Sequence, residues 1–202
     1  MHGLYTFVTG PLVWLAFIIF FGGCLYRLIR LFVLIHKKEP FIYSYFSLKY
    51  SLRSIFHWIT PFGSENMRRH PVFTIVAFAF HISLLLTPVF LLAHVMMVDE
   101  SWNISWWTMS DDAAKILTVI VIASCVFFLV RRLVSPEVQF VTSASDFAIL
   151  AIVAAPFITG LVAYYQWFNY QVVVILHVLS GEIMLVAIPF TRLSHMLFAP
   201  LT

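Results

Sequence analysis

Five long apolar runs divide the chain, and short polar segments separate them. The hydrocarbon core of a bilayer is about 30 Å thick, so a helix that crosses it needs about 20 apolar residues. Each run meets that length. We therefore predict an all-α integral membrane protein, in which residues 1–202 form a single domain with five transmembrane helices. The expected spans are residues 11–35, 72–98, 113–134, 147–167 and 172–196.

The overall composition supports lipid as the main solvent of this chain. Hydrophobic residues make up 62% of the sequence and charged residues only 10%, whereas a soluble domain carries about 25% charged residues. A soluble globule could not cover its surface with so few polar groups, and disorder would need low hydrophobicity and high net charge. The formal net charge of +3 is too small to indicate a nucleic-acid partner.

Charges at the ends of the runs predict the orientation, because cytoplasmic loops carry an excess of lysine and arginine. The loop after the second run is acidic, the third run ends in Arg131 and Arg132, and Arg192 lies near the C-terminus. We expect the N-terminus outside and the C-terminus inside. No lysine or arginine precedes the first run, so it is expected to be a retained span rather than a signal peptide. Eight basic residues lie between the first two spans: Arg27, Arg30, Lys37, Lys38, Lys49, Arg53, Arg68 and Arg69.

Two aromatic segments lie outside the predicted spans. Residues 39–69 mix aromatic side chains with lysine, arginine and serine, which favours a segment lying along the inner face of the membrane. The outer loop at residues 102–107, WNISWW, is typical of an aromatic belt at the membrane surface.

The two cysteines, Cys24 and Cys125, both lie inside apolar runs. The sequence has no CxxC pair for zinc or an iron–sulfur cluster, and no CxxCH for covalent haem. We therefore predict neither a disulfide framework nor those cofactors.

Four histidines lie within or at the ends of two predicted spans, where ionisable residues are costly and suggest function. His81 and His94 are 13 residues apart on the second span, and His177 and His195 are 18 apart on the fifth. The two spans run in opposite directions, so His81 and His195 should lie near the inner face and His94 and His177 near the outer face. Eighteen residues make five whole helical turns, which places His177 and His195 on one stripe.

Two cross-helix histidine pairs at two depths are what two bis-histidine haems need, since each iron takes one axial imidazole from either side. Gly181, Ser180 and Thr191 are small enough to let a macrocycle approach, and Arg192 could pair with a propionate. We expect His81, His94, His177 and His195 to be the metal ligands.

The spacing on the second span leaves alternatives open. Thirteen residues put His81 and His94 roughly 140° out of phase on a regular helix, which a kink at Pro88 could correct in part. Met96 or Met97 is the alternative outer ligand. Between the proposed haems, Glu182 is either a proton-path residue or a neutral carboxyl satisfied by a neighbour.

Three motifs carry a resemblance to a known family: LHVLSGEIMLVAIPFTRLSHM with its 18-residue histidine spacing, RRLVSP followed by TSASD, and FHIS around His81. They resemble the dihaem cytochrome b of the respiratory nitrate reductase gamma-subunit type. That subunit has its second helix-two histidine at the position of Leu91. The 13-residue spacing ending in FLLAH, the opening MHGLYTFVTGPLVW and the stretch PFGSENMRRHP are more similar to the cytochrome b subunit of transmembrane redox complexes of sulfate-reducing bacteria.

The resemblance implies a dihaem cytochrome b in a bacterial inner membrane that takes part in sulfate respiration. His81 and His195 would hold the inner haem b, and His94 and His177 the outer one. It also implies a periplasmic multihaem cytochrome c and a cytoplasmic iron–sulfur protein of the heterodisulfide-reductase type as partners.

A menaquinone site beside one haem is a further hypothesis, because quinone chemistry needs a proton donor or acceptor in an aromatic slot. Inner candidates are Arg192 and the aromatic segment 41–58. Two rival functions remain open: a cofactor-free membrane anchor or assembly subunit, and a transporter in which histidines and Glu182 relay protons. Any catalysis would belong to an assembled complex. The outer quinone-site candidates are Lys115, Asp112, Tyr164, Tyr165, Asn169 and Gln171.

Overall fold

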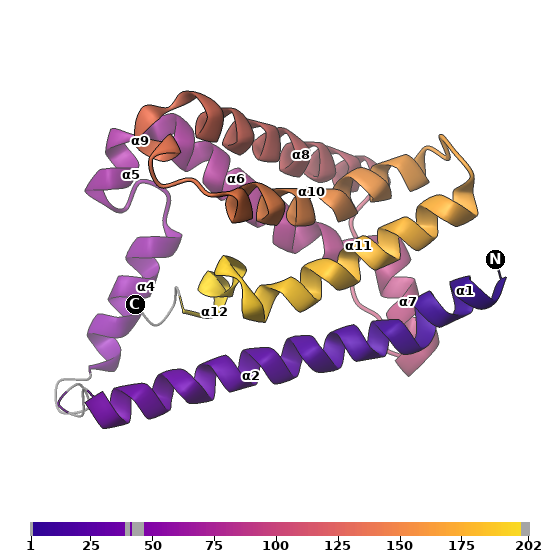
Figure 1. Cartoon of the computed structure of the whole chain (residues 1–202), viewed down its shortest axis with the longest axis horizontal. Helices are drawn as coiled ribbons and strands as arrows, with labels where there is room; N and C mark the ends of the chain where they lie inside the picture. The colour runs from indigo at the N-terminus through magenta and orange to yellow at the C-terminus, as the bar shows by residue number, and fades with distance from the viewer. Residues whose placement is uncertain (1, 39–40, 42–46, 199–202) are drawn as a thin grey trace.

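The computed structural model describes residues 2–38, 41 and 47–198, which form helices and turns and contain no strand (Figure 1). The helices that follow one another along the chain are α1 (His2–Phe7), η1 (Val8–Leu12), α2 (Val13–Lys38), α4 (Leu48–Ile59), α5 (Glu65–Arg69), α6 (Pro71–Phe90), α7 (Leu92–Trp102), α8 (Asp111–Val134), α9 (Pro136–Gln139), α10 (Ala144–Tyr164), α11 (Tyr170–Phe190), η2 (Arg192–Ser194) and α12 (His195–Phe198).

Five helical segments are long and apolar enough to cross a membrane, as the hydrophobic pattern predicts. They are Gly3–Lys38, Pro71–Phe90, Asp111–Val134, Ala144–Tyr164 and Tyr170–Phe190. Only 11% to 28% of each span is buried inside the protein, so most of the apolar surface needs lipid around it. The chain is a multi-pass membrane protein.

The five spans alternate in direction, so the bundle has two chemically different ends (Figure 1). The basic end carries Arg69, Arg131 and Arg192, where α6 begins and where α8 and α11 finish. The acidic end carries Asp99 and Asp111, where α7 finishes and α8 begins.

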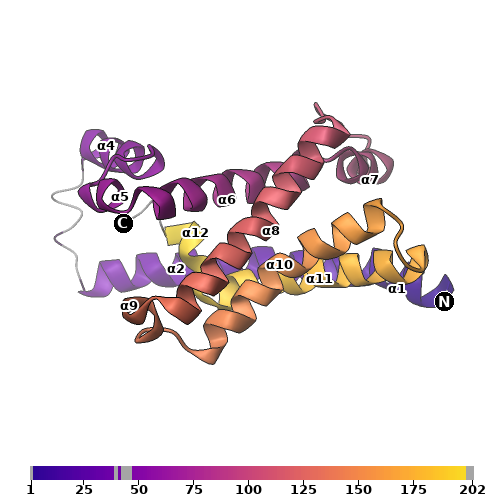
Figure 2. The same ribbon diagram turned by 90° about the horizontal axis from the view of Figure 1, so that it is seen from above.

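Helices pack in the order α6, α8, α10, α11, α2, each against the next. Among the described residues, α6 and α11 do not pack along each other, and Figure 2 shows the space between them from above. A small apolar core joins α6, α8 and α10. Its buried members are Phe80, Val121, Cys125, Val153 and Phe157. Cys125 and Cys24 are buried free thiols, in agreement with the sequence prediction.

The first span begins earlier than the expected residue 11. Helix continues from α1 through η1 into α2, because the π-helical turn η1 accommodates Pro11 inside the helix. Proline has no N–H for the ladder and its ring crowds the preceding turn, and a π turn is one way to absorb both effects.

The second span does not extend over residues 72–98 as one helix, and this expectation is wrong. Pro71 begins α6, as a first-turn proline predicts, but α6 ends at Phe90. Leu91 takes up an extended conformation with ψ 127°, and α7 starts afresh at Leu92. Pro88, inside the last turn, donates no hydrogen bond to the helix ladder.

The fifth span is also shorter than the expected 172–196. Helix α11 ends at Phe190, one residue after Pro189. The next residue, Thr191, is extended with ψ −171°. The chain then turns through η2 into α12. The single-stripe argument for His177 and His195 is therefore wrong, because no continuous helix joins them. A turn brings His195 to its position instead.

The aromatic segment between the first two spans contains α4, an amphipathic helix without buried residues that lies apart from the bundle at its basic end (Figure 1). This helix agrees with the expected surface segment. The expectation for residues 39–40 and 42–46 falls outside the described residues.

Candidate haem-binding histidine pairs

The structure brings the four predicted histidines together in the two predicted pairs. His81 on α6 lies beside His195, the first residue of α12, with ring centroids 6.1 Å apart. His94 on α7 lies beside His177 on α11, also with ring centroids 6.1 Å apart. Each pair brings the α6–α7 segment next to the α11–α12 segment, although α6 and α11 do not pack along each other.

This ring separation fits one metal ion between two imidazoles. A metal–imidazole bond of about 2 Å, with a ring centroid about 1 Å behind the bonded nitrogen, places two trans rings about 6 Å apart, centre to centre. Directly stacked or edge-on aromatic rings also lie 4.5–7 Å apart, so distance alone does not define the site. The orientation of the ring nitrogens is more specific.

All four histidines use the same nitrogen to reach the backbone. A carbonyl oxygen can only accept, so each Nδ1 carries a hydrogen, and the neutral ring then has its lone pair on Nε2. Metal-binding histidines usually fix their second nitrogen in this way. The Nδ1 contacts are His81 to Ala77 O at 2.7 Å, and His94 to Pro88 O, His177 to Pro156 O and His195 to Arg192 O at 2.9 Å.

The break after α6 positions His94. The last carbonyls of a helix have no partner within the helix, and here each one is satisfied by a group beyond the break. This arrangement turns His94 away from the phase that a regular helix would give it. The contacts are Thr87 O from Leu91 N–H, Pro88 O from His94 Nδ1, Val89 O from Trp106 Nε1 and Phe90 O from Met109 N–H.

The loop at residues 102–107 therefore has a structural role that the aromatic-belt interpretation missed. Trp106 caps α6 through Val89 O at 2.9 Å. Trp102 lies edge-on to Trp14 of the first span, with ring centroids 5.4 Å apart. Trp107 packs on Phe90. No local pattern in the sequence indicates these long-range contacts.

Gly160 on α10 makes room for the His177 ring. A Cβ built at Gly160 would lie 3.1 Å from Cε1 and 3.3 Å from Nδ1 of His177, tighter than ordinary packing. Thr159 Oγ1 lies 3.3 Å from the same Nδ1 and 3.2 Å from Ser180 Oγ. Sequence reasoning did not single out Gly160 or Thr159, because their role depends on how α10 packs against α11.

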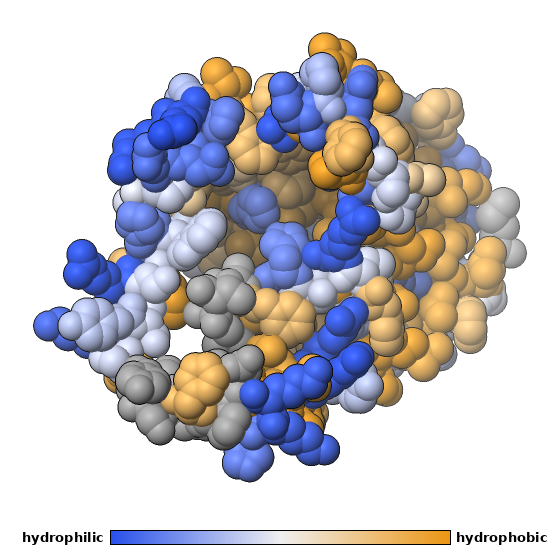
Figure 3. Space-filling model, turned by 60° about the vertical axis from the view of Figure 1, so that its left-hand side comes forward, coloured by the Kyte–Doolittle hydropathy of each residue, from blue (hydrophilic) through white to orange (hydrophobic). Residues whose placement is uncertain are grey.

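Two features near the pairs bear on whether a flat macrocycle could approach them. Gly181 lies one turn beyond His177 on the same helix, and a Cβ there would meet nothing within 4 Å. Figure 3, with the basic end forward, shows a hollow between the helices whose floor is mainly hydrophobic. Paired imidazoles whose Nδ1 atoms bond to the backbone, with an open glycine one turn from His177, fit the ligand needs of haem b.

Arg192 is held by an ion pair rather than left free. Its Nη1 lies 2.6 Å from Oδ1 of the buried Asp146, and Arg132 lies 3.5 Å from the same oxygen. Asp146 also forms a capping box with Ser143 at the start of α10. The Ser-x-x-Asp spacing could have indicated the cap, but not the two arginines. The prediction that Arg192 binds a propionate stays a prediction.

Another arginine reaches the turn that carries His195. Arg27 Nε donates to Pro189 O at 2.8 Å, near the end of α11. Gly23, one turn earlier on α2, allows the close approach, since a Cβ there would lie 2.7 Å from the Pro189 ring. Close packing of α2 on α11 therefore supports the end of α11. From the sequence, Arg27 contributes only to the predicted membrane orientation, and its contact with Pro189 could not be predicted.

The outer quinone-site candidates gather in part. Asp112, Lys115 and Tyr165 line a groove of about 490 Å³ between α8 and α10 at the acidic end. Lys115 Nζ lies 2.5 Å from Asp112 and 5.5 Å from the Tyr164 ring centre. Asn169 instead caps α11 by accepting from Val172 N–H. Gln171 is exposed at the start of α11.

Glu182 is buried between the two histidine pairs, and neither of its carboxyl oxygens has a hydrogen-bond partner among the described residues. The alternative of a carboxyl satisfied by a neighbour is therefore wrong for this structure. Met96 and Met97 are about half exposed, while His94 faces His177. The described residues contain no group of three or more metal-ligating side chains; haem needs only two from the protein.

Taken together, the fold and the paired histidines define a five-span helical membrane protein with two imidazole pairs across one bundle. Comparison with known proteins finds a relative in Nitratidesulfovibrio vulgaris, named only "Protein", that is 36% identical over 200 residues. The match covers 95% of this chain and 87% of the relative, so the chain belongs to the same family as that protein. No established family profile matches the chain.

Proposed function

We propose that this chain is an electron-transfer subunit that carries electrons across a membrane through two b-type haems. The observation that carries the proposal is the repeated histidine geometry: two ring pairs at 6.1 Å, each imidazole with Nδ1 tied to a backbone carbonyl. Two unrelated packing contacts would have little reason to repeat both features.

The chain's own residues would hold and orient the group, and haem would supply reversible one-electron transfer. His81 and His195 would hold one haem at the basic end, and His94 and His177 the other at the acidic end. From His177 to the end of α11 at Phe190 is 13 residues, a rise of about 20 Å. The two pairs therefore lie at different depths along the bundle, as a route across the membrane requires.

The finer parts of the proposal come from the family resemblance. We extend it to a bacterial inner membrane with the N-terminus outside, where the asymmetry of basic residues supports the orientation. A periplasmic multihaem cytochrome c and a cytoplasmic iron–sulfur protein of the heterodisulfide-reductase type would exchange electrons at the two ends. Menaquinone exchange would use the groove beside Lys115 and Tyr165.

The direct test is the visible spectrum of the purified whole chain. We expect b-type bands on reduction and about two haems per chain by pyridine haemochrome assay. His57→Ala should keep both haems, since His57 is exposed on α4 outside both pairs. It is the control for the loss of a histidine that is not a proposed ligand. A colourless sample that is folded and monodisperse, from cells that load haem into other membrane cytochromes, would overturn the proposal in favour of an anchor or a transporter.

A further inference from the structure

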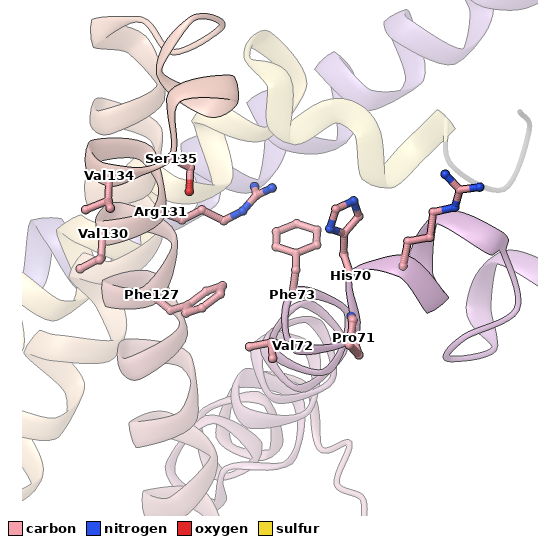
Figure 4. A pocket seen from close by; sticks show the side chains of 10 residues that line it. His70, Pro71, Val72, Phe73, Phe127, Val130, Arg131, Val134 and Ser135 are labelled. Atoms are coloured by element: carbon pink, nitrogen blue, oxygen red, sulfur yellow. The ribbon is translucent and has the colours of Figure 1, made fainter.

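A second feature of the basic end is a groove on the outside of the bundle, between the start of α6 and the end of α8. Its volume is about 440 Å³. One wall is apolar, with Phe127, Val130 and Val134 of α8. The polar side of the groove combines Arg131, near the end of α8, with Arg69 and His70, which lie just before α6 (Figure 4). None of these residues belongs to the histidine pairs.

The polar side of the groove is dominated by Arg131. Its guanidinium carbon lies 4.4 Å from the centre of the Phe73 ring, a cation–π contact, and Figure 4 shows the His70 ring beside Phe73. Arg69 also lines the groove, but it pairs with Glu65 at 2.6 Å. Arg131 is half-buried at the end of a membrane span.

The neighbouring arginine shows what is unusual about Arg131. Arg132 shares the carboxylate of Asp146 with Arg192, while Arg131 has no carboxylate within ion-pair distance among the described residues. Phe73 covers one face of the guanidinium without changing its charge. A half-buried cation in an apolar setting is costly unless an anion accompanies it.

Helix α6 adds to the positive potential at the same place. It begins at Pro71, so its N-terminal end, which carries the positive side of the helix dipole, faces the polar side of the groove. An arginine, a histidine and a 20-residue helix beginning at one place favour a phosphate group. The apolar wall along α8 favours a hydrocarbon chain beside it.

We propose that this groove binds an anionic membrane phospholipid, with the phosphodiester on Arg131 and an acyl chain along Phe127 and Val130, which precede Arg131 on α8. Charge and apolarity are arranged in the order in which a lipid presents them: headgroup at the membrane boundary and chain toward the bilayer centre. Basic sites between transmembrane helices are a known way to recognise anionic headgroups. The proposal does not depend on haem, because the groove lies outside the bundle.

The test is native mass spectrometry of the whole chain in detergent, titrated with phosphatidylglycerol and with phosphatidylcholine of the same acyl chains. We expect the first bound lipid to be phosphatidylglycerol. Arg131→Gln should weaken that binding about fivefold and leave phosphatidylcholine unchanged. Arg131→Lys should lose less, because it keeps the charge. Arg30→Gln is the control, an exposed arginine on α2 away from the groove.

A second variant separates a lipid from free phosphate. Val130→Trp fills the apolar wall and should weaken lipid binding while leaving Arg131 in place. If inorganic phosphate alone binds as well as phosphatidylglycerol, and Val130→Trp has no effect, the site is a phosphate site and the lipid proposal is wrong. Equal losses for Arg30→Gln and Arg131→Gln would show general surface attraction and would also overturn it. Unchanged thermal unfolding of each variant shows that folding is intact.

Discussion

The two histidine pairs have the same ring separation but are held in different ways. At the acidic end, His94 and His177 are nearly parallel, with 19° between the ring planes. His177 bonds to Pro156 on another helix and packs against Gly160. At the basic end, His81 and His195 are nearly perpendicular, at 89°. Each bonds only to a carbonyl three or four residues earlier.

This difference shows which contacts each pair depends on. The acidic-end pair is built by tertiary packing: the α6 break, the loop that caps it, and the close approach of α10 to α11. The basic-end imidazoles bond only to local carbonyls and both rings are exposed, although Arg27 and Asp146 on other helices hold the segment that carries His195. We therefore expect distant substitutions to affect the acidic-end site more strongly than the basic-end site.

The largest effect should come from removing a ligand at one end. His177→Ala should lose the acidic-end haem and keep the basic-end haem at least in part, so that haem content falls from about two per chain toward one. His94→Ala should behave in the same way, because it removes the second proposed ligand of the same haem. The measurement is haem per chain together with the reduced spectrum of membranes and purified protein.

Equal retention of both haems in His177→Ala would contradict the pairing. If only His94→Ala keeps the parent spectrum, His94 is not a ligand, and Met96 or Met97 must be considered. Both variants need a normal elution profile, since a packing defect could also reduce haem content.

The sequence alone could predict most of the architecture here. Apolar length predicted the five spans, and the depth of each histidine with alternating helix direction predicted both pairs, although the spacing argument that put His177 and His195 on one stripe was wrong. Helix ends were less predictable. Pro88 and Pro189 signalled weak points, but the breaks at Leu91 and Thr191 depend on which distant groups take the freed carbonyls.

The supporting residues were harder to predict, for a physical reason. Gly160 has no side chain, so nothing in its local pattern distinguishes it from a glycine such as Gly22 that faces open space. The local sequence around Asp146 predicts a helix cap. Its ion pair with Arg192 depends on the contact between α10 and the segment after α11, which no local pattern indicates. Such roles belong to pairs of elements rather than to one segment.

A smaller, partial effect is expected from Gly160→Val. The added carbons would crowd His177, whose ring atoms already lie 3.1 to 3.3 Å from a Cβ at this position. We expect the acidic-end haem to fall to about half or less, by analogy with the 1–3 kcal/mol cost of overpacking, with the basic-end haem unchanged. Haem content and the separate redox titration of each haem are the measurements.

Gly22→Val is the matched control, because a Cβ there meets nothing within 4 Å. It changes the same residue type on another span. If Gly22→Val lowers haem content as much as Gly160→Val does, the effect is general helix destabilisation, and the contrast between the two pairs is lost.

The ring-plane angles predict a spectroscopic difference without any substitution. Nearly parallel imidazoles separate the energies of the two iron orbitals that overlap with them, whereas perpendicular imidazoles leave those energies close. In the oxidised protein, electron paramagnetic resonance should therefore show one rhombic low-spin signal and one strongly anisotropic signal with a larger maximum g value. His177→Ala should remove the rhombic signal. Two identical signals would contradict the geometric difference between the sites.

The smallest effect is expected at Glu182, which lies five residues beyond His177 and has no hydrogen-bond partner among the described residues. A buried carboxylate without a partner is costly, and an electron arriving on a nearby haem adds negative charge. Proton binding at Glu182 would relieve both. Glu182→Gln should keep haem content near two per chain and reduce the pH dependence of the haem potentials, which cannot exceed about 59 mV per pH unit for one proton per electron.

The position of Glu182 predicts which of the two haem potentials should change more. Glu182 is nearer in sequence to His177 than to His195, so a proton-coupled role should change the slope of the acidic-end potential more than that of the basic-end potential. Glu182→Leu, which removes the polar group altogether, should give the same flattened slope as Glu182→Gln. Slopes that match the parent in both variants would leave Glu182 without a role in proton coupling, and the cost of burying it would then need another explanation.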